Sequence, residues 1–125
     1  MRALVADDST AIRGYLRRIL TACGFEVLES KNGLEGLERL REQQGIDLVL
    51  LDWNMPVMSG IDLLQLIRSE PGLSSVCVMM VTTENDLREI SRALELGANE
   101  YVMKPFTPEI IADKLALLGF PVPVA

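Results

Sequence analysis

Acidic, hydroxyl and basic side chains stand at the ends of several short apolar segments of this sequence. Asp7 and Asp8 directly follow the first segment, and Asp52 follows the third. Thr82 and Lys104 follow the last two. If these segments are parallel strands of one sheet, their carboxyl ends share one edge, which is where open α/β sheets bind ligands. The sequence therefore predicts that the five side chains meet in one site.

Three converging carboxylates would form a strongly anionic pocket. Two unit charges ~4 Å apart repel by about 4 kcal/mol at an effective dielectric of 20. Such a pocket holds a proton or binds a cation, and oxygen ligands with room for water suit Mg²⁺. A divalent ion, a lysine and a threonine hydroxyl around one carboxylate are what phosphoryl transfer needs. Asp52 is the candidate nucleophile, because a carboxylate can form an acyl phosphate.

Each of these residues also has a simpler explanation. Adjacent aspartates before a helix can be an ordinary acidic cap, and Thr82 can be a plain strand end. Lys104 can be a solvated loop residue. The following proline favours a functional lysine, because a fixed turn would aim its side chain.

The segments that must position this chemistry alternate regularly along the chain. The expected strands are residues 3–6, 26–28, 48–51, 76–81 and 101–103. The expected helices begin at Ser9 or Thr10, after Asn32-Gly33, near Ser59, near Asp86, and at Thr107 with Pro108 in the first position. Five β–α units in strict alternation indicate an α/β fold, with a doubly wound parallel sheet and helices on both faces.

Helical spacing of apolar residues predicts which side of each helix is buried. In the first helix, arginines 13, 17 and 18 are expected to face away from the core. In the fourth, Leu87, Ile90 and Leu94 are expected to be buried.

The composition suits a single domain spanning residues 1–125, since 49% of them are hydrophobic. The net charge of −6 argues against direct nucleic-acid binding and favours a basic protein partner. The sequence has no histidine, which disfavours zinc sites and histidine-assisted nucleophiles. Two isolated cysteines fit a reducing cytoplasm. No apolar run approaches the roughly 18 residues of a membrane span, and the N-terminal residues do not resemble a secretory signal.

Four stretches of the sequence, ADDS, LLDWNMPVMSG, VTTE and YVMKPF, resemble the motifs of the receiver domain of two-component response regulators. The chain is similar above all to the stand-alone chemotaxis type, and the motifs occur in the family's order along its whole length. The resemblance implies a flavodoxin-like fold, in which a five-stranded parallel sheet of order 2-1-3-4-5 is flanked by five helices. It also implies a phosphorylation-activated signalling switch.

Carried over by position, the resemblance gives Asp52 the role of phosphoacceptor, charged by a histidine kinase. Asp8 would ligate Mg²⁺ and Asp7 would position it through water. Asp52 and the backbone carbonyl of Asn54 would complete the protein ligands. Asn54 and Glu84 would tune the lifetime of the phosphoryl group.

The remaining implied roles concern phosphoryl binding and the switch. Lys104 would contact the phosphoryl group, and Thr82 would hydrogen-bond to it and then draw Tyr101 inward. Thr83 stands where the family usually has a smaller residue, so its bulk is expected to restrict access to Asp52. The signal would leave through the face formed by the fourth helix, the fifth strand and the fifth helix, toward a protein partner.

The resemblance further implies a cis peptide bond between Lys104 and Pro105. We expect a cytoplasmic monomer that contacts neither nucleic acid nor membrane, and that catalyses only its own phosphorylation and dephosphorylation. The cognate kinase, the output partner, and whether the chain is freestanding or part of a larger protein stay open.

Three other readings compete with this one. A Mg²⁺-dependent phosphatase of the haloacid-dehalogenase type also uses an aspartate, but needs D-x-D where this chain has adjacent Asp7 and Asp8. A flavodoxin-like cofactor module would need a phosphate-binding loop after the first strand. A receiver-like docking unit without phosphorylation would not need all five site residues.

Overall fold

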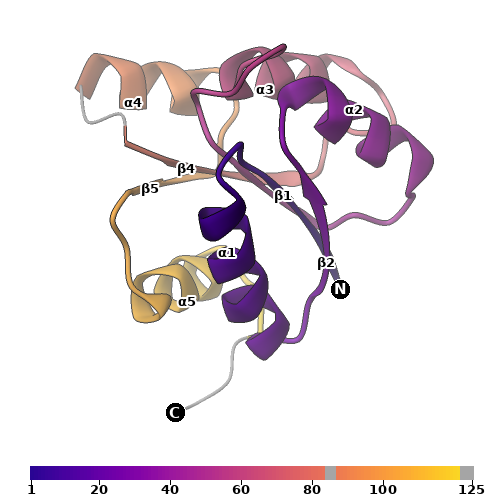
Figure 1. The fold of residues 1–125 in the computed structure, drawn as a ribbon. Coiled ribbons are helices and arrows are strands. Elements are labelled where there is room, and N and C mark those ends of the chain that lie inside the picture. Colours follow the sequence, from indigo (N-terminus) through magenta and orange to yellow (C-terminus); the bar gives the residue numbers. More distant parts are fainter. Residues whose placement is uncertain (84–86, 122–125) are drawn as a thin grey trace.

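The computed structural model describes residues 1–83 and 87–121, which form a three-layer α/β structure (Figure 1). Within those ranges, strands and helices alternate along the chain. The strands are β1 (Arg2–Ala6), β2 (Glu26–Ser30), β3 (Leu48–Leu51), β4 (Cys77–Thr82) and β5 (Glu100–Met103). The helices are α1 (Thr10–Ala22), α2 (Gly33–Glu42), α3 (Gly60–Ser69), α4 (Leu87–Glu95) and α5 (Pro108–Leu117).

The strands form a parallel sheet of order β2-β1-β3-β4-β5 in the described part of the chain. This confirms the expected doubly wound, flavodoxin-like topology. Ala6 pairs with Leu51 across β1 and β3, and Thr82 pairs with Met103 across β4 and β5. The residues that follow these strands therefore share one edge of the sheet.

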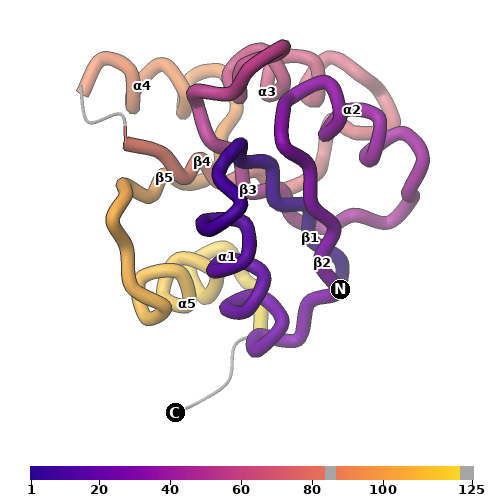
Figure 2. The backbone as a smooth tube through the Cα atoms, in the orientation of Figure 1, coloured from indigo at the N-terminus to yellow at the C-terminus, as the bar shows by residue number. Residues whose placement is uncertain are grey.

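Helices cover both faces of the sheet, as Figure 1 and Figure 2 show: α1 and α5 lie on one side and α2, α3 and α4 on the other. An apolar cluster lies on each face of the sheet, one beneath α1 and α5 and the other beneath α2, α3 and α4, and consecutive strand residues alternate between the two. Leu4 packs toward α2 and α3 while Val5 packs toward α1 and α5, and both are 0% exposed. Burial on both faces explains why the central strands are uninterrupted apolar runs.

Side-chain caps start four of the helices, as the sequence predicts. The cap residues are Ser9, Asn32, Ser59 and Thr107, and each accepts a hydrogen bond from the backbone N–H three residues later. Pro108 occupies the first turn of α5. The expected start of the fourth helix near Asp86 lies outside the described residues. No helix in the described ranges is both long and apolar enough to cross a bilayer.

The sequence-based prediction of burial is wrong for part of α4. Leu87 and Leu94 are 78% and 45% exposed, and Ile90 is half-buried. The helix approaches the sheet through the small side chain of Ala93, which is 0% exposed, so Leu87 and Leu94, two turns apart, lie on its outer side. Met103 is 50% exposed, because it ends the edge strand β5.

Candidate functional site

The end of β1 presents Asp7 to the shared edge. Its N–H donates to the carbonyl of Ser30 at 3.1 Å, which continues the pairing of β1 with β2. The Asp7 carboxylate is buried, and its two oxygens have separate partners. Oδ1 accepts from the N–H of Ser9 at 2.9 Å, and Oδ2 accepts from Lys104 Nζ at 2.7 Å. The next residue, Asp8, is exposed.

The end of β3 presents Asp52 beside the first two acids. Its N–H donates to the carbonyl of Ala6 at 2.9 Å, and the residue is 7% exposed. One carboxylate oxygen from each of Asp7, Asp8 and Asp52 lies within 4.8 Å of the others. The structure therefore brings the three predicted acids together in an arrangement that could hold a metal ion.

Burial raises the pKa of the Asp52 carboxyl above its ordinary value, and the neighbouring Asp7 carboxylate raises it further. The Lys104 ammonium and hydrogen bonds with Thr82 and Lys104 act in the opposite direction, without cancelling the rise. A divalent cation in the pocket would favour the ionised carboxyl, because its charge outweighs that of any one neighbour.

The ends of β4 and β5 supply the predicted hydroxyl and ammonium. Thr82 is fully buried, and its carbonyl accepts from the N–H of Lys104 at 2.9 Å. The Lys104 side chain is 13% exposed, and its Nζ lies 3.4 Å from Asp52 Oδ2. The peptide bond between Lys104 and Pro105 is cis, which confirms the prediction.

The remaining predicted residues surround this centre at different depths. Thr83 and Asn54 are exposed beside the buried acceptor. Tyr101 is 8% exposed and packs in the apolar cluster under α4, on the strand that carries Lys104. Glu84 lies outside the described residues. The switching and lifetime roles of these residues stay predictions.

Two contributors to the site were missed in the sequence. Arg13, expected to face away from the core, has a side chain only 15% exposed and donates from Nη1 to the carbonyl of Asp7 at 2.7 Å. Gly60 donates its N–H to the carbonyl of Trp53 at 2.9 Å, and a Cβ there would overlap the carbonyl oxygen of Asp52. The glycine in the quoted motif was a usable signal. No pattern in the sequence indicated that Arg13 would contact the carbonyl of Asp7.

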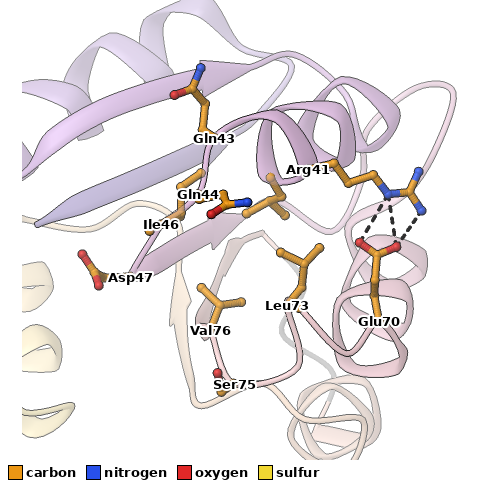
Figure 3. A pocket seen from close by; sticks show the side chains of 12 residues that line it. Arg41, Gln43, Gln44, Ile46, Asp47, Glu70, Leu73, Ser75 and Val76 are labelled. Atoms are coloured by element: carbon orange, nitrogen blue, oxygen red, sulfur yellow. Dashed lines mark hydrogen bonds and ion pairs between the residues drawn. The ribbon is translucent and has the colours of Figure 1, made fainter.

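A hollow of about 600 Å³ lies at the opposite edge of the sheet, between the ends of α2 and α3 and the starts of β3 and β4 (Figure 3). An exposed ion pair flanks it, with Arg41 Nη2 2.7 Å from Glu70 Oε1. None of its lining residues is a predicted site residue. The chemistry is therefore assigned to the carboxyl edge.

Converging acids with a lysine, at the carboxyl edge of a 2-1-3-4-5 parallel sheet, define the receiver class of signalling domains. A sequence model of the response regulator receiver domain matches residues 3–116, and the chain belongs to this family. Receiver domains of this kind work with histidine kinases and downstream targets in two-component, phosphorylation-dependent signalling. Mg²⁺ and a phosphorylated residue are typical of the family.

Named relatives are chemotaxis regulators. The chain is 38% identical over 119 residues to chemotaxis protein CheY1 of Helicobacter pylori, covering 94% of this chain and 96% of that protein. It is 38% identical over 116 residues to a CheY homolog of Campylobacter jejuni, covering 92% and 89%. Among solved structures, chemotaxis response regulator CheY4 of Vibrio cholerae superposes with a TM-score of 0.87 at 29% identity, covering 94% and 97%.

Proposed function

We propose that Asp52 accepts a phosphoryl group from a histidine kinase in a Mg²⁺-dependent reaction. The observation that carries the proposal is the position of Asp52 between two other acids and Lys104, whose Nζ is 3.4 Å from it. A carboxylate oxygen of Asp52 would attack the phosphorus, and the P–N bond of the phosphohistidine would break with its electron pair passing to the nitrogen. The imidazole would leave neutral, because its other ring nitrogen carries a proton in the phosphohistidine. The product is an acyl phosphate on Asp52.

The donor set fits a magnesium ion. Asp7, Asp8, Asp52 and the backbone carbonyl of Asn54 would hold it, because all four offer hard oxygen ligands and the exposed Asp8 leaves room for water. When bound, the ion neutralises negative charge on the phosphoryl oxygens and the approaching carboxylate.

Other side chains of this site would bind the phosphoryl group and set how long it persists on Asp52. Lys104 would neutralise one phosphoryl oxygen, and the Thr82 hydroxyl would donate to another. Thr83 would narrow the entrance, while Asn54 and Glu84 would set the lifetime. The chain would thus catalyse only its own phosphorylation and dephosphorylation, without turning over a separate substrate.

We propose that the signal leaves through α4, β5 and α5. Leu87, Leu94 and Met103 give this face exposed apolar side chains, and the buried Tyr101 of β5 would link the face to Thr82. The partner would be a protein and not nucleic acid, given the net charge of −6. The chain would act as a single-domain monomer in the cytoplasm, where ATP supplies such kinases.

Acetyl phosphate labelling tests the acceptor. With Mg²⁺, intact mass should show one added phosphoryl group on the wild type and none on Asp52→Asn, because the amide is a poor nucleophile of similar shape. Asp113→Asn, an exposed acid on α5, is the matched control and should label normally. Labelling that survives Asp52→Asn would falsify the acceptor assignment, and labelling unaffected by EDTA would contradict the metal requirement. Steady phosphate release from a small monoester would indicate a phosphatase instead.

NMR of the phosphorylated protein tests the output face. Backbone amide shifts should extend from the site to Thr82, Tyr101 and the surface of α4. Shifts confined to the residues around Asp52 would leave the acceptor assignment standing and contradict the proposed face.

A further inference from the structure

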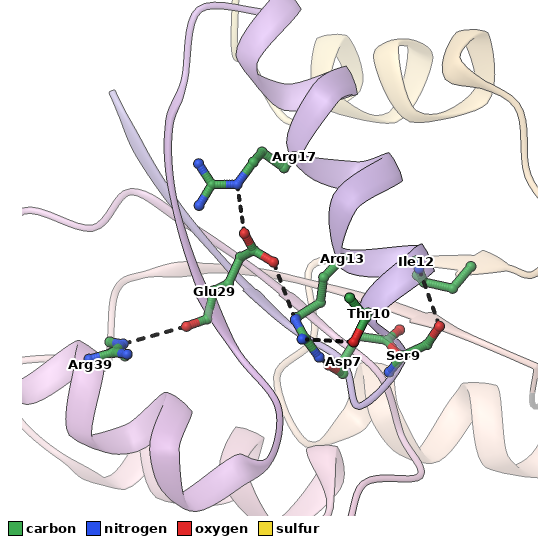
Figure 4. A network of polar contacts seen from close by, with 8 residues as sticks. All are labelled: Asp7, Ser9, Thr10, Ile12, Arg13, Arg17, Glu29 and Arg39. Atoms are coloured by element: carbon green, nitrogen blue, oxygen red, sulfur yellow. Dashed lines mark hydrogen bonds and ion pairs between the residues drawn. The ribbon is translucent and has the colours of Figure 1, made fainter.

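One guanidinium ties the turn that carries two of the acids to the neighbouring strand (Figure 4). Arg13 donates from all three of its side-chain nitrogens. Nη1 lies 2.7 Å from the carbonyl of Asp7, Nε lies 3.2 Å from Glu29 Oε1, and Nη2 lies 3.3 Å from Thr10 Oγ1. The planar fork of arginine is thereby held in one orientation, at a side chain only 15% exposed.

The anchor on β2 is itself held by other residues. Arg17 Nε donates to Glu29 Oε2 at 2.6 Å, and Arg39 of α2 donates to the Glu29 carbonyl at 3.4 Å. Figure 4 shows both α1 arginines reaching the Glu29 carboxylate while Arg39 approaches its backbone from α2. Arg13 is therefore braced against a residue fixed from two helices, which limits its movement.

The carbonyl that Arg13 holds belongs to the peptide group between Asp7 and Asp8. Because this group is planar, fixing its carbonyl fixes the plane that also contains the N and Cα atoms of Asp8, from which its side chain leaves the backbone. Asp7 and Asp52 are also held by burial, whereas Asp8 is exposed. The direction of the exposed acid thus depends more on the turn that carries it.

We infer that Arg13 is a positioning residue that orients Asp8 toward the metal pocket. The inference rests on the proposed function, because it assumes that Asp7, Asp8 and Asp52 hold Mg²⁺. A purely electrostatic role would have the opposite sign, since a positive charge beside the pocket repels a divalent cation. Removing Arg13 therefore distinguishes the two roles: Mg²⁺ binding should weaken if Arg13 positions Asp8, and tighten if its charge alone matters.

The test is a calorimetric Mg²⁺ titration of the unphosphorylated protein. Arg13→Met should weaken Mg²⁺ binding about tenfold, the lower end of the usual effect for residues that orient metal ligands. Arg13→Lys should weaken Mg²⁺ binding nearly as much, because lysine keeps the positive charge but lacks the planar guanidinium that donates to three acceptors at once. Arg41→Met is the matched control, since it removes an arginine that pairs with Glu70 at the opposite edge of the sheet, and should bind Mg²⁺ as the wild type does.

Acetyl phosphate labelling gives a second readout. Arg13→Met should label slowly at limiting Mg²⁺ and approach the wild-type rate at saturating Mg²⁺, because the chemistry at Asp52 is intact. A general loss of folding would instead lower the rate at every Mg²⁺ concentration. If Arg13→Met does not fold, Arg13→Lys decides by the same titration.

Unchanged or tighter Mg²⁺ binding by the Arg13 variants, with normal binding by the wild type, would overturn the positioning role and leave the proposed function standing. Absence of saturable binding by the wild type would instead remove the proposed metal site, and the inference with it.

Discussion

The ammonium of Lys104 lies 2.7 Å from Asp7 Oδ2, although 97 positions of sequence separate the two residues. Their side chains are 13% and 2% exposed, so the pair is largely withdrawn from water. The same ammonium also reaches Asp52 Oδ2 at 3.4 Å. Lys104 is thus the counter-charge shared by two buried carboxylates that would otherwise face each other.

Lys104→Met should lower the free energy of unfolding at neutral pH in EDTA by about 3 kcal/mol, because it leaves buried carboxylates without their partner. Saturating Mg²⁺ should restore part of the loss. Urea unfolding followed by Trp53 fluorescence measures both. Lys114→Met removes a more exposed ion pair with Glu100 and should cost much less. Equal losses in the two variants would contradict the shared counter-charge.

The raised pKa of Asp52 predicts how the metal-free protein responds to pH. The folded-state pKa lies above the unfolded value of about 3.9, so the stability contributed by this carboxyl is fully present below that pH and is lost as the pH rises through the folded pKa. Asp52→Asn removes this loss of stability, because the asparagine side chain does not ionise. The free energy of unfolding of Asp52→Asn, relative to that of the wild type, should therefore increase as the pH rises above about 4.

Urea titrations in EDTA at several pH values check this trend, with Asp113→Asn as the exposed control. A difference between Asp52→Asn and wild type that falls with pH would show that the folded protein favours the ionised carboxyl, and a flat difference would show no preference; both would contradict the raised pKa.

Two glycine-to-alanine changes should have opposite signs. A Cβ at Gly60 would overlap the backbone carbonyl oxygen of Asp52, which cannot move without disturbing the site. Gly60→Ala should therefore destabilise by about 3 kcal/mol. Inside α1, a Cβ at Gly14 meets its nearest neighbour, Arg18, at 3.8 Å, an ordinary contact. Gly14→Ala should stabilise by up to about 1 kcal/mol, from helix propensity alone. Thermal and urea unfolding of the Gly60→Ala and Gly14→Ala variants test whether the overlap at Gly60 causes the loss.

Arg68 joins α3 to the segments before β4 and β5. Its guanidinium donates to the carbonyls of Gly97, Ser74 and Val76 and to the side chain of Asn99. Arg68→Met would leave several of these acceptors unpaired and should lower the free energy of unfolding by about 3 kcal/mol.

The matched control for Arg68 is Arg41→Met, which breaks an exposed ion pair with Glu70 and should leave stability nearly unchanged. Equal effects in chemical denaturation would show that the contacts of Arg68 contribute no more than an exposed ion pair.

Val57 occupies a strained position in the loop after Asp52. Its φ is 70°, and the N–H of Met58 donates to the carbonyl of Pro56 at 2.7 Å, which makes Val57 the centre of a tight γ-turn. A β-branched residue is unfavourable at positive φ, and Val57 is 76% exposed, so packing offers little compensation.

Val57→Asn should raise the free energy of unfolding by about 1 kcal/mol, because asparagine tolerates this conformation. Val57→Ala should gain less. Urea unfolding of both variants measures the difference, and no gain for asparagine would show that the turn is not strained.

Local signals explain why much of this structure is predictable from sequence. Ser9 and Thr107 are caps whose partners lie three residues away, and the buried strands are apolar because both faces are covered. The alternation of these elements restricts the topology, since parallel crossovers are right-handed and chain neighbours pack together. The convergence of Asp7, Asp52 and Lys104 follows from that topology, because strand ends share an edge.

Contacts that depend on the distance between remote segments were not predictable. Arg13 could be placed on a helix face, but its length lets it reach back to the carbonyl of Asp7 and across to Glu29 on β2. Leu87 and Leu94 follow the helical spacing of a buried stripe, yet α4 meets the sheet through Ala93 and leaves them outside.

By itself, the sequence determined the order of the elements and which side chains gather at the carboxyl edge, because strand and helix periods and capping act within a few residues. Only the tertiary structure decided that Lys104 pairs with Asp7 more closely than with Asp52, and that Arg13 reaches the carbonyl of Asp7. Those outcomes are set by differences of an ångström or less between segments far apart in the chain, which no local pattern records.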